Sequence, residues 1–158
     1  MSYLKYYLND GYGKMLKKCF VTVFIIFFLA SLKAEEQKVF FDKTFMRNLN
    51  SAKAIERDSF FEKNLNSIIQ TRAVVVSLDK TARYKRLFRL VLEDKEAEAH
   101  KMKIIYNVFF NKEETRSILN AGDIFEFSGQ LVSSAPLNTA RTAYILDIIL
   151  QEGALLIE

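Results

Sequence analysis

The chain has 158 residues, of which 50% are apolar and 27% are charged. This balance excludes an intrinsically disordered tail, a collagen-like repeat and a polytopic membrane protein, and the length favours a single domain. The formal net charge at pH 7 is +4, which would suit an anionic partner if the positive charge were spread over the whole chain.

The excess positive charge is concentrated at the N-terminus. Residues 1–34 contain five lysines and one acid, whereas residues 35–158 contain 18 basic and 18 acidic residues. Lysines precede the apolar run 19–32, and a polar segment begins at Glu35. A basic start, a short apolar run and a polar continuation form the pattern of an export signal. We therefore interpret residues 1–34 as an export signal.

Two alternatives for residues 1–34 stay open: an uncleaved anchor that contacts the membrane through residues 19–32, and a buried core helix. The run is short, because a permanent membrane span needs about 20 apolar residues. Met15 is a second candidate start, which would give a more compact signal. The single cysteine, Cys19, lies within the run, so the chain after residue 34 has neither a disulfide nor a cysteine-bound metal.

The segment 35–66 is expected to form one or two amphipathic helices. Apolar residues Phe41, Phe45, Leu49 and Ala52 recur at steps of three and four, and no glycine or proline interrupts them. This spacing places them on one face of a helix. We expect that face to pack on the domain that follows.

From residue 68 the pattern changes to alternation of β-branched and aromatic residues with polar ones, which is typical of strands. Asn111 can cap a short helix and Gly122 can end it. The expected elements are strands at 68–78, 84–93, 102–110, 124–132 and about 142–151, with a helix at about 112–120.

The order β-β-β-α-β-β is that of an OB-fold, a small five-stranded Greek-key barrel. The expected fold class is therefore mainly β with α, and the expected OB-fold-like domain spans residues 67–158. Gly129 lies in the middle of the fourth strand, where a glycine allows a bend or a close backbone approach. The fifth strand is apolar on both faces except for Asp147, so we expect the N-terminal helices to cover it.

The stretch from about 60 to 152 resembles the bacterial OB-fold family called tRNA anticodon-binding-like. The resemblance rests on the lead-in 60–64, the valines 74–76 and the passage 121–129. It implies a barrel and no catalytic chemistry. Members are often exported or lipid-anchored proteins of unassigned function, so the resemblance does not imply tRNA binding.

The chain shows no catalytic or cofactor motif. The only histidine, His100, lies in the polar connection 94–101 beside several acids, but lysines interleave with them and the spacing matches no metal loop. The serines lack a nucleophile elbow, and the five glycines form no phosphate-binding loop. We therefore expect no enzyme activity, no cofactor and no metal, and a solvated connection at 94–101.

One basic hairpin, residues 72–89, carries six cations and a single acid, Asp79. OB-folds commonly bind ligands on the outer face of the second and third strands. Alternation places Arg89, Asn107 and Phe109 on that face, unless the N-terminal helices cover it. The candidate ligand-binding residues are Arg83, Lys85, Arg89, Asn107 and Phe109.

The expected function is a non-enzymatic binding module that is exported to the periplasm or cell envelope and binds a protein or glycan there. The alternative is a single-stranded nucleic-acid-binding domain that uses the hairpin 72–89. Nucleic-acid binding requires many lysine and arginine contacts with phosphate. Because residues 35–158 carry balanced charge, we do not expect a nucleic-acid partner.

Overall fold

The computed structural model describes residues 38–157, and the side chains of residues 38–151. The predicted export segment 1–34 and the candidate start Met15 lie outside these residues. Within residues 38–157, every helix is too short or too polar to cross a membrane.

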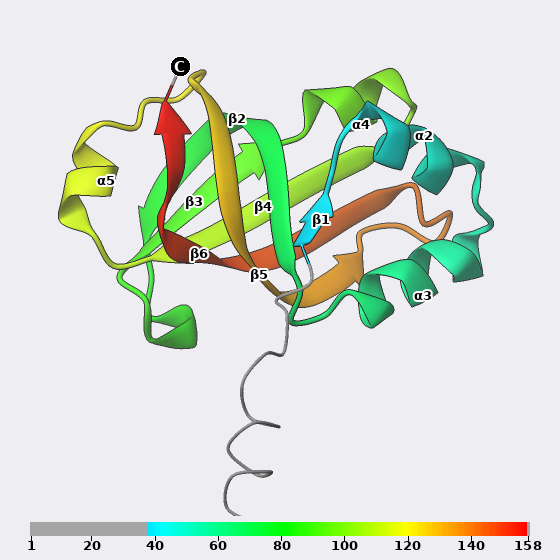
Figure 1. Ribbon diagram of the computed structural model, residues 1–158, viewed down its shortest axis with the longest axis horizontal. Coiled ribbons are helices and arrows are strands. Elements are labelled where there is room, and N and C mark those ends of the chain that lie inside the picture. Colours follow the sequence, from blue (N-terminus) through cyan, green and yellow to red (C-terminus); the bar gives the residue numbers. More distant parts are fainter. Residues whose placement is uncertain (1–37, 158) are drawn as a thin grey trace, which may run out of the picture. The chain divides into compact units, whose positions relative to one another are not determined.

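The described residues are mainly β with short helices between strands (Figure 1). The strands are β1 (Lys38–Phe40), β2 (Ile68–Lys80), β3 (Phe88–Glu93), β4 (Lys103–Phe110), β5 (Ile124–Pro136) and β6 (Ala143–Ile157). The helices are α2 (Lys43–Ser51), α3 (Ala54–Lys63), the 3-10 turn η1 (Arg83–Lys85), α4 (Lys95–Ala99) and α5 (Glu113–Ser117).

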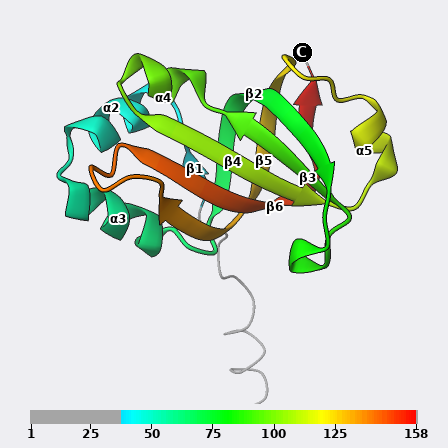
Figure 2. The same ribbon diagram turned by 180° about the vertical axis from the view of Figure 1, so that it is seen from behind.

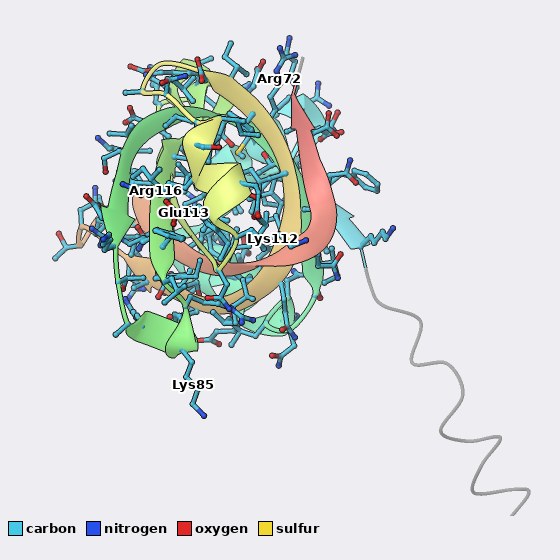
Figure 3. The ribbon with its side chains drawn as sticks, turned by 90° about the vertical axis from the view of Figure 1, so that its left-hand side faces the viewer. Arg72, Lys85, Lys112, Glu113 and Arg116 are labelled. Atoms are coloured by element: carbon cyan, nitrogen blue, oxygen red, sulfur yellow. The ribbon has the colours of Figure 1, made fainter. Side chains whose placement is uncertain are left out.

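Five of the strands pair in a ring. Their order is β2-β3-β4-β6-β5, and β5 pairs again with β2. The pairs are antiparallel except for β4 with β6, which is parallel, and β1 adds to β2 in parallel. The six-stranded sheet is therefore mixed, and Figure 3 looks onto one end of the ring, with α5 in front.

The inside of the ring is filled by the apolar side chains that alternation along each strand predicts. On β3 these are Phe88, Leu90 and Leu92, each at most 4% exposed. Other strands contribute large side chains of the same kind: Tyr106, Val108, Phe125, Phe127, Leu146 and Ile148. The core therefore lies within the ring and extends to its two ends.

Helices cover both ends of the ring (Figure 1). At one end, Phe61 of α3 packs on Tyr144 of β6, with ring centroids 4.7 Å apart. At the other end, the Arg116 guanidinium of α5 lies 5.5 Å from the centroid of the Phe88 ring. The N-terminal helices thus pack at one end of the core. The outer face of β4 and β6 is covered instead by Arg83 and Tyr84, which lie between β2 and β3.

The segment before β2 contains two helices, where one or two amphipathic helices were predicted, and adds a strand that was not predicted. The Asp42 carboxylate accepts a hydrogen bond from the Phe45 amide (2.8 Å), which caps α2. Met46 and Leu49 of α2 are buried. The unpredicted strand is β1, three residues too short for an alternating pattern to be recognised.

Several predicted boundaries were wrong. The second strand begins at Phe88 and not at residue 84, because Tyr84 and Lys85 have left-handed backbone angles that a strand cannot contain. The helix after β4 spans only Glu113–Ser117. The last two strands continue to Pro136 and Ile157, well beyond the residues where alternation is clear.

The expected solvated connection 94–101 is also wrong in part, because it contains α4 and a buried carboxylate. Asp94 is 1% exposed. Its Oδ1 accepts a hydrogen bond from the Ala97 amide (2.9 Å), and its Oδ2 accepts one from the Tyr106 hydroxyl (2.5 Å). Burial raises the pKa of Asp94 above its usual value of 3.8, and these hydrogen bonds only partly offset the rise.

This buried carboxylate predicts a pH-dependent stability difference between the wild type and Asp94→Asn. Because the folded-state pKa is raised, the contribution of protonated Asp94 is complete below its unfolded pKa and is lost as pH rises through the folded-state pKa. Asparagine keeps the shape and cannot ionise. The free energy of unfolding is measured with urea at about pH 4 and about pH 7. Relative to the wild type, the variant is expected to be more stable at about pH 7 than at about pH 4. A difference that does not change with pH would contradict this account.

Candidate binding surface

The connection between β2 and β3 is a tight turn. The Thr81 amide donates a hydrogen bond to the Leu87 carbonyl (2.9 Å) and so closes the base of the turn. We call residues 82–86, which lie between these two residues, the strap. Tyr84 and Lys85 have φ values of 54° and 57°, a left-handed conformation that costs energy for residues other than glycine. The strap is therefore strained, and contacts of its side chains must offset that strain.

The outer face of β4 and β6 carries a buried amide and carboxylate. Asn107 lies opposite Asp147 in the parallel pairing, and its Nδ2 donates to Asp147 Oδ1 (2.8 Å). Both residues are 4% exposed, and Phe109 on the same face of β4 is 0% exposed. We call Asn107, Phe109 and Asp147 the Asp147 site.

Side chains of the strap contact the Asp147 site; in Figure 2 the strap is the green turn between β2 and β3. An Arg83 guanidinium nitrogen pairs with Asp147 Oδ2 (2.7 Å), and the Tyr84 hydroxyl donates to the same oxygen (2.9 Å). The Tyr84 ring meets Phe109 edge-on, with centroids 5.0 Å apart. The Arg83 guanidinium also lies 5.9 Å from the Phe109 centroid, within cation–π range. The site is thus filled by the chain's own side chains.

The electrostatics of the site keep Tyr84 protonated. Burial raises the pKa of its hydroxyl above 10.0, and the hydrogen bond to Asp147 and the charge of that carboxylate raise it further, while Arg83 lowers it. At neutral pH Tyr84 is therefore a phenol that donates to Asp147. The carboxylate receives hydrogen bonds from a phenol, an amide and a guanidinium, so its buried charge is well compensated.

The structure brings together three of the five predicted site residues. Arg83, Asn107 and Phe109 meet at the Asp147 site. Arg89 lies beside them, opposite Phe109 in the sheet, and its guanidinium pairs with Asp79 (2.8 Å) while its Nε is buried without a hydrogen bond. Lys85 is exposed and points away from the protein (Figure 3).

The sequence left two alternatives for Phe109, an exposed ring on the outer face or a ring covered by the N-terminal helices, and the structure shows a covered ring that is 0% exposed. Alternation correctly places Asn107 and Phe109 on the outer face, but it says nothing about what covers that face. The cover is Tyr84 and Arg83 of the strap, and not the N-terminal helices.

Sequence reasoning missed two residues of this surface, Tyr84 and Asp147. Asp147 left a signal, since it is the one acidic residue of an otherwise apolar fifth strand, and such a residue needs a partner when it is buried. Tyr84 left none, because its alternation with Arg86 and Phe88 is compatible with a strand.

An open cavity of about 270 Å³ lies elsewhere, between β1, β2 and the start of α4. Its walls carry charges of both signs, and Gln70 Nε2 donates to Glu126 Oε1 (2.6 Å) across them. The lining residues are Phe40, Phe41, Asp42, Lys43, Gln70, Thr71, Arg72, Glu96 and Glu126. Among the described side chains, no three of the types His, Cys, Asp and Glu form a group that could hold a metal ion.

Comparisons with known proteins give distant structural similarities alone. No protein-family model matches the chain, and no curated protein matches it. A "putative nucleic acid-binding lipoprotein" from Klebsiella pneumoniae is similar with 11% identity and a TM-score of 0.43, over 71% of this chain and 87% of that one. The aspartyl-tRNA synthetase of Entamoeba histolytica is similar with 12% identity and a TM-score of 0.41, over 78% of this chain and 25% of that one.

The asparaginyl-tRNA synthetase of Entamoeba histolytica is similar with 17% identity and a TM-score of 0.35, over 58% of this chain. The chain spans a quarter or less of the synthetases that it matches. At these scores the similarities carry no information on what the chain binds. The family resemblance of residues 60–152 therefore stays a prediction.

Proposed function

We propose that the chain is a non-enzymatic, exported binding module of the cell envelope, with a protein or glycan as its partner, and that its ring of strands is an OB-fold barrel. The barrel is supported by the pairing order β2-β3-β4-β6-β5, which returns to β2, and by the position of α5 between β4 and β5 in the chain. Export is supported by the lysines and apolar run before residue 35.

The observation that carries this proposal is the chemistry of the Asp147 site. Its centre is a carboxylate held by Asn107 and flanked by Phe109. Carboxylate, amide and aromatic groups suit peptide amides, cations and sugar hydroxyls. Phosphate groups would meet like charge at Asp147, and nucleic-acid binding depends on neutralising phosphates with cations. The site therefore favours a protein or glycan partner.

One observation favours the alternative, a single-stranded nucleic-acid-binding domain. Lys80, Lys85 and Arg86 lie close together in sequence around the β2–β3 turn, and within the described residues none of them makes an ion pair. Such cations could follow a phosphate backbone. The aromatic ring that would stack on bases, Phe109, however lies at the Asp147 site, where the carboxylate would repel a phosphate backbone.

Cell fractionation tests the export half of the proposal. The full chain is expected in the envelope fraction, with its N-terminus either removed near residue 34 or retained as an anchor, as measured by intact mass. An unprocessed chain in the soluble cytosolic fraction would contradict export.

Titration with labelled single strands separates the two partner classes. We expect binding by the full chain to be negligible at physiological salt. A strong, salt-dependent shift that is lost in Lys80→Ala/Lys85→Ala/Arg86→Ala would establish the alternative. The matched control is Lys38→Ala/Lys53→Ala/Lys63→Ala, which removes three other lysines outside the β2–β3 turn.

A further inference from the structure

The Arg83–Asp147 ion pair joins a core residue to a surface turn. The Asp147 side chain is 5% exposed, whereas that of Arg83 is 57% exposed. Asp147 lies between Leu146 and Ile148, both fully buried in β6, so the strand fixes the position of its carboxylate on the outer face. Arg83 belongs to a turn and can leave. The fixed half of the pair is therefore the carboxylate.

Asn107 holds the carboxylate in place independently of the strap. Its Nδ2 bonds Asp147 Oδ1, while both strap contacts fall on Oδ2. If the strap moved, Oδ1 would keep its partner and Oδ2 would be exposed next to the face of Phe109. That arrangement is a preformed acceptor for a planar cation.

The strap is held over this acceptor by few interactions. Its two left-handed residues are strained. Within residues 38–151, its polar contacts with the rest of the protein are the side-chain contacts with Asp147 and the hydrogen bond from the Arg83 amide to Thr81 Oγ1 (3.1 Å). Segments with few buried contacts open at low free-energy cost compared with the core.

We propose that the Asp147 site binds the guanidinium of an arginine side chain of a partner protein, and that Arg83 occupies the site until that arginine displaces it. This inference rests on the proposed function and narrows its partner to a protein with an exposed arginine. Arginine fits better than lysine, because only a planar guanidinium can pair with Oδ2 and stack on Phe109 at once. When the partner's guanidinium replaces that of Arg83, the buried charge of Asp147 still has a positively charged partner.

Other charged groups around the site are compatible with this exchange. Lys85 and Arg86 belong to the strap and would leave with it. Arg89 stays on the face, and its charge is paired with Asp79. The open site is unfavourable for a phosphate ligand, because opening the strap removes the cations of the strap and exposes the Asp147 carboxylate.

The test uses the full-length chain, purified in non-ionic detergent, and three blocked tripeptides: Gly-Arg-Gly, Gly-Lys-Gly and Gly-citrulline-Gly. Citrulline has the shape of arginine without its charge. Binding is measured by calorimetry and by NMR signals of the Tyr84 and Phe109 rings. Removing the internal occupant with Arg83→Ala is expected to tighten Gly-Arg-Gly binding by about ten- to a hundredfold, since the closed strap reduces the competent fraction.

The matched control is Lys63→Ala, which removes one exposed positive charge from α3, outside the strap and the site, and it is expected to leave binding unchanged. Asp147→Asn added to Arg83→Ala is expected to abolish the gain. Gly-citrulline-Gly is expected to bind none of the variants measurably, and Gly-Lys-Gly more weakly than Gly-Arg-Gly.

Two further arms keep the proposal falsifiable. Arg83→Ala/Tyr84→Ala removes both strap contacts, in case Tyr84 alone holds the strap closed. For a variant that fails to fold, the wild type is titrated to high peptide concentration, where only Gly-Arg-Gly should shift the Tyr84 and Phe109 signals. Equal effects of the arginine and citrulline peptides, or no gain in either folded variant, would overturn the proposal.

The outcomes also separate this inference from the proposed function. Tighter binding of labelled single-stranded DNA by Arg83→Ala than by the wild type would overturn it in favour of the nucleic-acid alternative. An envelope location without arginine preference would remove this inference and leave the proposed function standing. A cytosolic location with strong arginine preference would contradict export and leave arginine binding at the Asp147 site standing.

Discussion

The Gly129→Val variant is expected to lose most of its resistance to urea. A Cβ atom at position 129 would lie 2.4 Å from the Ile148 Cγ2 atom and 2.7 Å from the Ile149 carbonyl oxygen. The second contact is with backbone that is itself paired in the sheet, so it cannot move aside cheaply. Overpacking of a core usually costs about 1–3 kcal/mol, and we expect Gly129→Ala to reach that range and Gly129→Val to exceed it.

The close approach at Gly129 arises from the way β5 crosses β6. The pairing of these strands shifts register between Phe127 and Gly129 and again between Leu131 and Ser133. These irregularities bend the strands, and bending brings the two backbones close together. A side chain at position 129 would therefore disturb the point where the ring curves.

Urea unfolding followed by circular dichroism measures the effect, because the chain has no tryptophan for fluorescence. Ser128→Ala is the matched control. It changes the neighbouring residue of the same strand, which is half-buried and faces the other way, and should shift stability by no more than about 0.5 kcal/mol. Equal stability of Gly129→Val and the wild type would show that β5 and β6 do not approach as described.

Phe61→Ala should be the second severe change, with a loss of about 3–5 kcal/mol. Phe61 is 0% exposed and is the main aromatic contact between α3 and the ring. Its ring centroid lies 4.7 Å from that of Tyr144 and 6.3 Å from that of Phe41. Truncation would leave a cavity between helix and sheet that these large neighbours cannot close.

Ile55→Ala on the same helix is the control for Phe61→Ala. Ile55 is 73% exposed, so its truncation removes little buried surface. We expect its thermal midpoint to stay close to that of the wild type, while that of Phe61→Ala falls steeply. If both variants behaved alike, α3 would not be part of the cooperative core.

The sequence was most informative where structure depends on neighbouring residues. Alternation identified Phe88, Leu90 and Leu92 as core residues of β3, because the side-chain period of a strand is local. Gly122 was expected to stop a helix, but the helix ends earlier, at Ser117; what was local to Gly122 is its φ of 93°, which glycine tolerates best. The alternation of Phe125 and Phe127 likewise placed both rings inside.

The sequence was less informative where two distant segments decide the outcome. The three residues of β1 are a strand only because Ile68, Ile69 and Gln70 lie beside them. The short α4 depends on Asp94, whose carboxylate is buried against Tyr106. Residues 68–70 lie outside the local window that periodicity uses, and a single contact 12 residues from Asp94 leaves no periodic pattern.

By itself, the sequence determined the basic N-terminal segment, the neutral balance of charge after it and the five strands of the ring with the helix between β4 and β5. Only the tertiary structure decided that the outer face of β4 and β6 is covered and not free. The covering contact joins Tyr84 to Asp147, which are 63 residues apart. Alternation along a strand predicts to which face a side chain points. Which group packs against that side chain depends on how the ring closes and on where the strap lies in the folded protein.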